Sequence, residues 1–159
     1  MCSKNKNEKN HSEFKNPIVN HDVSYTPFNE NLDNPDFRVC DSTDIRSGRN
    51  RLKYIGGIEK LEKDICNSYK VKTAYKSFSG FIVIRFIVNC KNRRGRYRVQ
   101  SLDYNFSPKN ASSDIADYVM KLIKGLNQWE KSTSSDPETE YSKFINIRIE
   151  NGQIKHILL

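Results

Sequence analysis

The stretch SGFIVIRFIVNC, from Ser79 to Cys90, carries the strongest structural signal in the chain and decides the fold. Its apolar residues fill one face of a β-strand without a break and most of the other face. One face holds Ile82, Ile84, Phe86 and Val88, and the other holds Phe81, Val83, Arg85 and Ile87. Because apolar residues occupy both faces, we expect a central strand that is largely covered on one side and partly on the other.

A β-hairpin is predicted directly after this strand. The run KNRRG at positions 91–95 is typical of a turn, with Gly95 supplying a positive φ angle. Residues 96–104 then return as a second strand. Tyr97 and Val99 share one of its faces, so the return strand also offers apolar side chains to a core.

Amphipathic helices are expected on either side of the hairpin. The apolar stripe of the first helix contains Ile58, Leu61, Ile65 and Tyr69. Cys66 adjoins that stripe and is predicted to be a buried thiol. The second helix starts near Ser112 or Ser113, either of which is a good N-cap. Its stripe contains Ile115, Tyr118, Val119, Leu122 and Leu126.

The chain ends with one more strand and a short hairpin arm. Residues 144–149 alternate as a strand, Asn151 and Gly152 form a strong hairpin-turn signal, and residues 154–158 form a short final strand. The order helix, strand, strand, helix, strand predicts an α+β fold. We expect an antiparallel three-stranded sheet with two helices on one face, plus the C-terminal hairpin arm.

The N-terminal part of the chain lowers the overall fraction of apolar residues. The hydrophobic fraction is 36% and the mean hydropathy is -0.77, both low for a globular chain. Residues 1–36 are rich in Asn, Lys, Asp and Ser and show no apolar periodicity. Such a stretch cannot offset an ordering entropy of about 1–2 kcal/mol per residue. We therefore predict a disordered polar tether at 1–36 and one domain at 37–159.

Positive charge gathers in the predicted hairpin. The net charge is +8, which suits acidic partners of any kind. The hairpin contributes Lys91, Arg93, Arg94, Arg96 and Arg98. With Tyr97 among them, these residues resemble a patch for nucleic acid or anionic lipid. The simpler interpretation is a solvated turn that blunts edge pairing, and nucleic acid ranks behind it.

The four cysteines have no metal-binding spacing. Cys40 and Cys90 each follow a short extended run, and we predict a disulfide between them, with two reduced buried thiols as the alternative. Cys2 follows Met1 and precedes a polar run, as in a lipoprotein whose start Met replaces its signal peptide. Lipidation of Cys2 is therefore one hypothesis, and an ordinary second residue is the other.

Catalysis is not expected. The chain contains no HExxH, Walker or GxGxxG motif and no Ser/His/Asp order. Its Gly56-Gly57 pair is too short for a phosphate loop and suits a turn before the first helix. We predict a non-catalytic protein with no cofactor, no metal and no small-molecule substrate.

From Tyr54 to its end, the sequence resembles the TonB C-terminal domain family in its Bacteroidetes-type form. The lead YIGG at 54–57 with Leu61 is similar to the family's entry into its first helix. Residues 80–89 look like its Gly-x-Val-x-Val-x-Phe-x-Val-Asn strand. Leu126 and Trp129 match the end of its second helix, and residues 145–152 match its final strand and turn.

The resemblance implies a periplasmic domain that recognises an extended peptide of an outer-membrane receptor, or of another envelope protein, by β-augmentation. The predicted binding edge is the last long strand, containing Lys143, Phe144, Ile145, Asn146, Ile147, Arg148 and Ile149. The plainer alternative is that these residues only complete the sheet. Asn146 and Arg148 are expected to face solvent. The domain could also form a homodimer.

The chain departs from the family in two ways. The family's energy transducers carry a membrane anchor and a long Pro-rich spacer, and this chain has five prolines and no apolar stretch long enough to span a membrane. The Pro that follows the family's tryptophan is replaced by the run EKS at 130–132. A stand-alone or lipid-anchored binding relative therefore fits better than an energy transducer. The alternatives are a basic domain for nucleic acid or anionic membrane, and a purely structural envelope lipoprotein.

Overall fold

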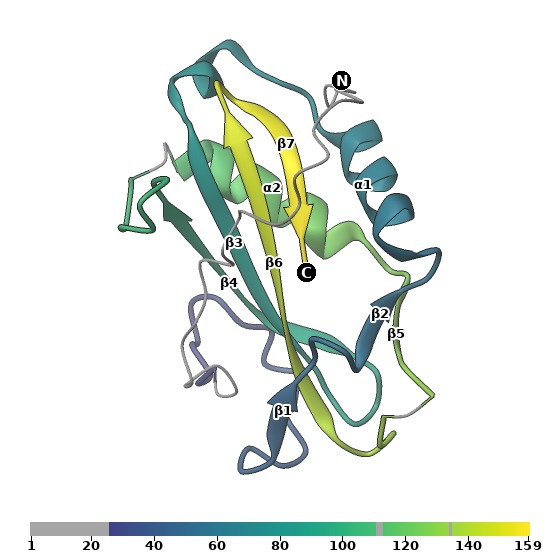
Figure 1. Cartoon of the computed structure of the whole chain (residues 1–159). Coiled ribbons are helices and arrows are strands. Elements are labelled where there is room, and N and C mark those ends of the chain that lie inside the picture. Colours follow the sequence, from purple (N-terminus) through teal and green to yellow (C-terminus); the bar gives the residue numbers. More distant parts are fainter. Residues whose placement is uncertain (1–25, 111–112, 134) are drawn as a thin grey trace.

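The computed structural model describes residues 26–110, 113–133 and 135–159. Within them the protein is α+β, with two α-helices and a mixed sheet (Figure 1). The strands are β1 (Ile45–Ser47), β2 (Leu52–Tyr54), β3 (Gly80–Val88), β4 (Arg94–Leu102), β5 (Trp129–Lys131), β6 (Glu140–Glu150) and β7 (Gln153–Leu158). The helices are α1 (Gly57–Ser68), α2 (Ser113–Gly125) and the short 3₁₀ helix η1 (Thr73–Ser77).

The main sheet has five strands, and its path runs β1-β6-β3-β4 with β7 also paired to β6. The predicted antiparallel trio is present as β4, β3 and β6. The prediction of three antiparallel strands was nevertheless incomplete, because β1 joins β6 in parallel and β7 joins it antiparallel. Three-residue strands such as β1 are too short to leave a periodic signal.

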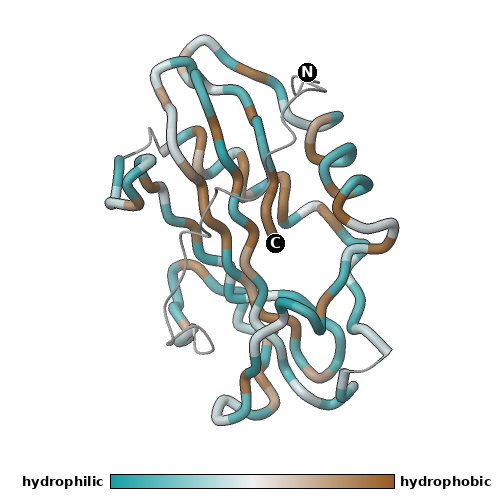
Figure 2. Tube along the Cα trace, in the orientation of Figure 1, coloured by the Kyte–Doolittle hydropathy of each residue, from teal (hydrophilic) through white to brown (hydrophobic). Residues whose placement is uncertain are grey.

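Both helices cover the same face of this sheet. Leu61 and Ile65 of α1 and Ile115, Val119 and Ile123 of α2 form one cluster with the inner rows of β3 and β6. Figure 1 shows α2 behind the sheet and α1 beside β7. Figure 2 shows the hydrophobic segments concentrated in the strands and helices. Ile58, which was predicted to belong to the buried stripe, is 40% exposed at the start of α1.

The opposite face of the sheet is also buried, more completely than predicted. Ile87 packs with Phe37 and Ile45, two residues from the chain before β2. A second cluster on this face contains Phe81, Val83 and Leu102, with Phe144 packed against it. Residues 26–45 therefore contribute to the covering of this face, and β3 is a strand with both faces buried.

The hairpin between β3 and β4 differs from its prediction in one backbone feature. The positive φ angles fall on Asn92 (57°) and Arg96 (52°), and Gly95 has none. Gly95 is small for another reason, because a Cβ there would lie 2.3 Å from Cγ of the Phe37 ring. The register of the pairing places Arg96 and Tyr97 opposite the single residue Phe86, which is a β-bulge.

Two of the sequence motifs that carry the family resemblance meet in space. Strand β2 pairs with β5, and this pairing sets Tyr54 directly opposite Trp129. Their rings meet edge to face with centroids 5.1 Å apart. The indole of Trp129 also contacts the Phe86 ring, at 5.4 Å. These contacts join the lead into α1 and the strand after α2 to the central strand of the sheet.

Candidate protein-binding surface

The predicted binding edge, Lys143–Ile149, is not an edge. It lies within β6, which pairs with β3 from Tyr141 to Ile149 on one side. On the other side β1 covers Glu140, Tyr141 and Ser142, and β7 covers residues 146–150. The prediction of a free edge at β6 was therefore wrong. Of the predicted residues, only Lys143, Phe144 and Ile145 lie between the two flanking strands.

The side chains of this strand are also less exposed than predicted. Asn146 was expected to face solvent, yet it is fully buried. Arg148 is half-buried, and its guanidinium lies 5.4 Å from the centroid of the Tyr104 ring. Lys143 is 2% exposed. Ile145, Ile147 and Ile149 lie in the main core, as their alternation predicts. The side chains of β6 therefore form part of the core of the domain.

The outer strands of the main sheet are β4 on one side and β7 and the three-residue strand β1 on the other. Strand β7 has six residues and lies beside α1 (Figure 1). Strand β4 has nine residues, and β3 is its neighbour in the sheet. Its last two residues are capped, because Leu102 bridges to Pro108 and the amide of Lys109 donates to the carbonyl oxygen of Ser101 at 2.9 Å. The open part of β4 therefore lies before Ser101.

The cap also shows which backbone groups of β4 point away from β3. The Ser101 carbonyl points outward, since it accepts from Lys109. In an antiparallel pair the outward-pointing residues alternate. The N–H and C=O of Val99 therefore point outward as well, while Gln100 and Arg98 bond toward β3. Val99 and Gln100 are half-buried and exposed, respectively, so this part of the edge is reachable from solvent.

The predicted basic patch divides into two groups. Arg96 and Arg98 hold the segment before β1: Arg96 donates to the carbonyl oxygen of Thr26 at 2.8 Å, and Arg98 binds both carboxylate oxygens of Asp33 at 2.7 and 2.8 Å. Arg93 is exposed and also contacts this segment, since its Nη1 donates to the carbonyl oxygen of Asp36 at 3.2 Å. Lys91 is exposed, and Arg94 is half-buried. The patch is therefore partly an anchoring structure, which the interpretation as a solvated turn did not anticipate.

The segment anchored by these arginines overlaps the predicted tail. Thr26 is fully buried and Asp33 is 9% exposed. The hydrogen bond from Arg98 holds the pKa of Asp33 below its usual value. The predicted boundary at residue 36 is therefore too late, because residues 26–36 pack against β4. Residues 1–25, including Cys2 and its predicted lipidation, lie outside the described residues.

A pocket of about 510 Å³ opens beside the start of β4. Its walls come from the segment before β1, the β3–β4 hairpin and the last turn of α2. The lining residues are Leu32, Asp33, Asn34, Asn92, Arg93, Arg94, Gly95, Arg96, Tyr97 and Lys124. Within the described part of the chain, Arg94 Nη1 and Arg96 Nε are buried and have no hydrogen-bond acceptor. The pocket therefore combines four cationic side chains with one carboxylate, that of Asp33.

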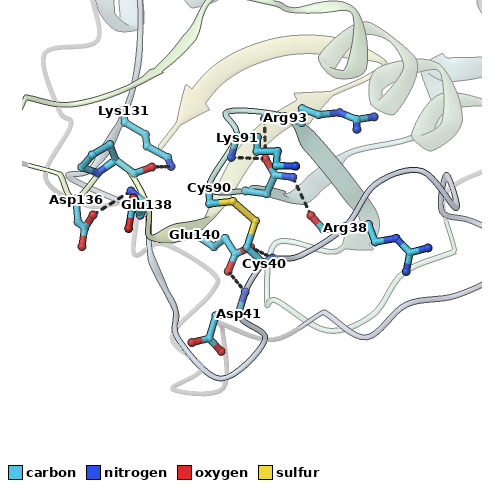
Figure 3. The surroundings of a disulfide bond; sticks show 12 residues. Arg38, Cys40, Asp41, Cys90, Lys91, Arg93, Lys131, Asp136, Glu138 and Glu140 are labelled. Carbon is cyan, nitrogen blue, oxygen red and sulfur yellow. Dashed lines mark hydrogen bonds between the residues drawn. A yellow bond between two sulfur atoms is a disulfide. The ribbon is translucent and has the colours of Figure 1, made fainter.

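The predicted disulfide between Cys40 and Cys90 is confirmed, and it closes a loop with a sequence separation of 50 (Figure 3). The Glu140 carboxylate beside it accepts hydrogen bonds from the amides of Cys40 and Asp41. The Asn89 side chain donates to the Arg38 carbonyl oxygen at 2.8 Å. The end of β3 is thus fastened covalently and by hydrogen bonds to residues 38–41.

Cys66 differs from its prediction as a buried thiol. It is half-buried and disulfide-bonded. Glu140 lies close enough to the sulfurs of Cys40 and Cys90 to form a three-ligand group, but both sulfurs are bonded to each other. Among the residues that the structure describes, neither helix has the length and apolar composition needed to cross a bilayer.

No protein-family model, curated protein or solved structure matches the chain. The resemblance to the TonB C-terminal domain family therefore stays a prediction from the residues named above.

Proposed function

We propose that this chain is a non-catalytic binding domain of the bacterial cell envelope that takes up an extended segment of another protein by β-augmentation. The partner class comes from the family resemblance, which implies an outer-membrane receptor or another envelope protein. The site does not come from that resemblance, since β3 pairs with one side of β6, and β1 and β7 cover the other side except at residues 143–145. We place the incoming segment on the outer edge of β4.

The observation that carries the proposal is the outward N–H and C=O of Val99, in the open part of the nine-residue strand β4. An added strand gains main-chain hydrogen bonds there without displacing any described segment. The bulge at Arg96 and Tyr97 limits the pairing at one end, and the Lys109 cap limits it at the other. The site therefore suits a short extended segment and discourages a long intermolecular sheet.

The disulfide supports the proposed cellular compartment, the bacterial envelope. Disulfides form and persist in oxidising compartments, of which the periplasm is one. The bond between Cys40 and Cys90 joins residues far apart in sequence and fastens the wall of the pocket to the sheet. A domain that must present an open strand edge gains from such a cross-link, because it keeps the flanking segment in place.

A second candidate function is binding to nucleic acid or to an anionic membrane, and the exposed Lys91 and Arg93 favour it. The two functions differ in how binding depends on salt. The main-chain hydrogen bonds of a paired peptide change little with ionic strength and a single charged side chain adds a shallow dependence, whereas several phosphate contacts give a steep loss of affinity. Binding to duplex DNA or to phosphatidylglycerol vesicles with a steep salt slope, and without linear-peptide binding, would favour the second function.

The proposal is tested with the substitution Val99→Pro. Because the Val99 N–H points away from β3, proline there removes a donor to the partner and leaves the β3–β4 ladder intact. Linear peptides are selected from a random displayed library against the oxidised domain, and their affinities are measured by fluorescence anisotropy. We expect Val99→Pro to weaken binding about tenfold, equivalent to one to two lost hydrogen bonds.

Val99→Ala is the matched control, since it shortens the same side chain and keeps the N–H. It should change affinity by less than about threefold. Amide exchange of the unmodified domain gives an independent readout, in which the Val99 N–H should become protected when peptide binds. The proposal fails if no linear peptide is selected, or if selected peptides bind Val99→Pro as well as the original and leave the Val99 amide unprotected.

A further inference from the structure

The pocket beside β4 draws cations from two elements of the fold. Arg93, Arg94 and Arg96 come from the β3–β4 hairpin, and Lys124 comes from the last turn of α2. Lys124 Nζ lies 5.4 Å from the centroid of the Tyr97 ring, which forms part of the wall. Lys124 therefore adds a cation from a second wall of the pocket to the three arginines of the hairpin.

The one carboxylate that lines the pocket is already paired with an arginine. Among the residues that line the pocket, Asp33 is the sole carboxylate, and both of its oxygens accept from Arg98. Its Oδ2 also accepts from the amide of Asn29 at 2.8 Å. In contrast, Arg94 Nη1 and Arg96 Nε are buried and unpaired within the described chain. A buried donor without an acceptor is costly, so a shift of these side chains that brought the two nitrogens to a ligand's acceptor oxygens would offset that cost.

The pocket and the open edge of β4 are continuous. Gly95, Arg96 and Tyr97 belong to both, and Val99 follows Tyr97 by two residues. Two residues of a strand span about 7 Å. A segment paired with Val99 therefore reaches the pocket within about two to four of its own residues. The volume of about 510 Å³ is in the range of sites that hold small organic groups.

From this geometry we infer that the pocket binds the carboxylate side chains of the same extended segment, so that the partner presents an acidic peptide. The inference rests on the proposed function and specifies its ligand. Carboxylates suit guanidinium groups because two parallel N–H···O bonds can form. Leu32 and Tyr97 supply apolar walls for the methylene groups of an Asp or Glu side chain.

The test uses the full chain in its oxidised form and compares Lys124→Glu with Lys121→Glu. Both lysines are exposed on α2, and Lys121 is not among the pocket-lining residues. The selected peptides should carry Asp or Glu at a fixed offset from the paired residue. Lys124→Glu should weaken their binding about five- to tenfold, with a larger effect at low salt, and Lys121→Glu less than about twofold.

Peptides in which the acidic residue is replaced by its amide complete the test. They should bind the unmodified domain more weakly, and Lys124→Glu should then cost them little further affinity. The inference is overturned if the acid and amide peptides bind equally, or if the two lysine variants behave alike. A Val99→Pro effect that persists in that case leaves the proposed function standing. Vesicle binding that depends on Lys124, combined with equal binding of the acid and amide peptides, would assign the pocket to lipid headgroups.

Discussion

A buried lysine interrupts the apolar row of β6 that faces the helices. Lys143 stands opposite Phe86 of β3, in the same row as Tyr141 and Ile145. It is 2% exposed, and its Nζ donates to the Arg49 carbonyl oxygen at 3.2 Å. Burial, together with the nearby Arg49 charge, lowers the pKa of Lys143 from 10.5 to about 8. This residue therefore makes stability depend on pH.

The sign of that dependence follows from proton linkage. Between about pH 8 and 10.5 the unfolded chain keeps a proton that the folded chain has lost, so the free energy of unfolding rises with pH. Below about pH 8 both states are charged and this contribution is constant. We expect Lys143→Met to raise the free energy of unfolding at about pH 7 by about 1–3 kcal/mol and to remove the rise. Urea unfolding at about pH 7 and 9.5 measures both effects. If the free energy of unfolding of the variant rises with pH as much as that of the unmodified protein, Lys143 is not the group responsible.

Sequence alternation at this scale predicts which residues share a face, but it does not show what covers that face. The pattern correctly assigned Ile145, Ile147 and Ile149 to the core. It wrongly assigned Asn146 to solvent, because a strand's second face is buried or exposed according to distant parts of the chain. Gly95 shows the same limit, since its small size is required by Phe37 and not by the turn itself.

At the scale of elements, the β6–β7 turn packs against the segment that contains η1 and is not a free surface loop. Asn151 and Gly152 both have positive φ angles, 48° and 74°, as expected for a two-residue hairpin turn. The Gly152 amide donates to the Phe78 carbonyl oxygen at 2.9 Å, and its own carbonyl accepts from the Tyr69 hydroxyl at 2.7 Å. A Cβ on Gly152 would lie 2.6 Å from the backbone of Tyr75. The turn therefore holds β7 in place beside β6.

These contacts predict different effects at two neighbouring positions. Gly152→Ala combines an unfavourable φ angle with a backbone clash, and should lower the free energy of unfolding by about 2–4 kcal/mol. Asn151→Gly keeps the turn and removes no described side-chain contact, so it should change stability by less than about 1 kcal/mol. Urea unfolding of the two variants tests this. Equal stabilities would show that the turn is not seated on η1.

The elements themselves were predictable where they were long. Both helices, β3, β4, β6 and the terminal hairpin follow from apolar periodicity and turn chemistry. The strands of three residues, β1, β2 and β5, could not be predicted, because their partners lie far away in sequence. The error about the binding edge has a different source, because the predicted hairpin arm, β7, itself pairs with residues 146–150, and only the cover of residues 140–142 by β1 escaped prediction.

At the scale of the whole molecule, the segment before β1 is part of the domain and forms one wall of the pocket. Its attachments run along its length: Asp33 to Arg98, Phe37 against Gly95, and Cys40 to Cys90. Its sequence is polar, so hydropathy alone predicted a tether over residues 26–36. Only the cysteine pairing pointed to a fixed end, and the pocket could not be predicted because its three walls come together only in the fold.

The disulfide therefore controls both stability and the proposed specificity. Closing a loop of this length contributes about 4 kcal/mol in the chain-entropy model. We expect the double variant Cys40→Ser, Cys90→Ser to lose about 2–4 kcal/mol in urea unfolding while its main sheet stays folded. Because the wall containing Leu32 and Asp33 is then held by non-covalent contacts alone, the variant should also lose part of its preference for acidic over amide peptides.

The stability and peptide preference of the double variant are compared with those of the oxidised, unmodified protein. No reductant is used, since reductant would also cleave the disulfide of Cys66. Val99-dependent peptide binding should persist in the double variant, because the β3–β4 ladder does not depend on the cross-link. A variant that kept full stability would show that the non-covalent contacts suffice to hold the segment. A variant that lost all peptide binding while folded would show that the open edge itself depends on residues 26–45, and that the edge and the pocket form a single site.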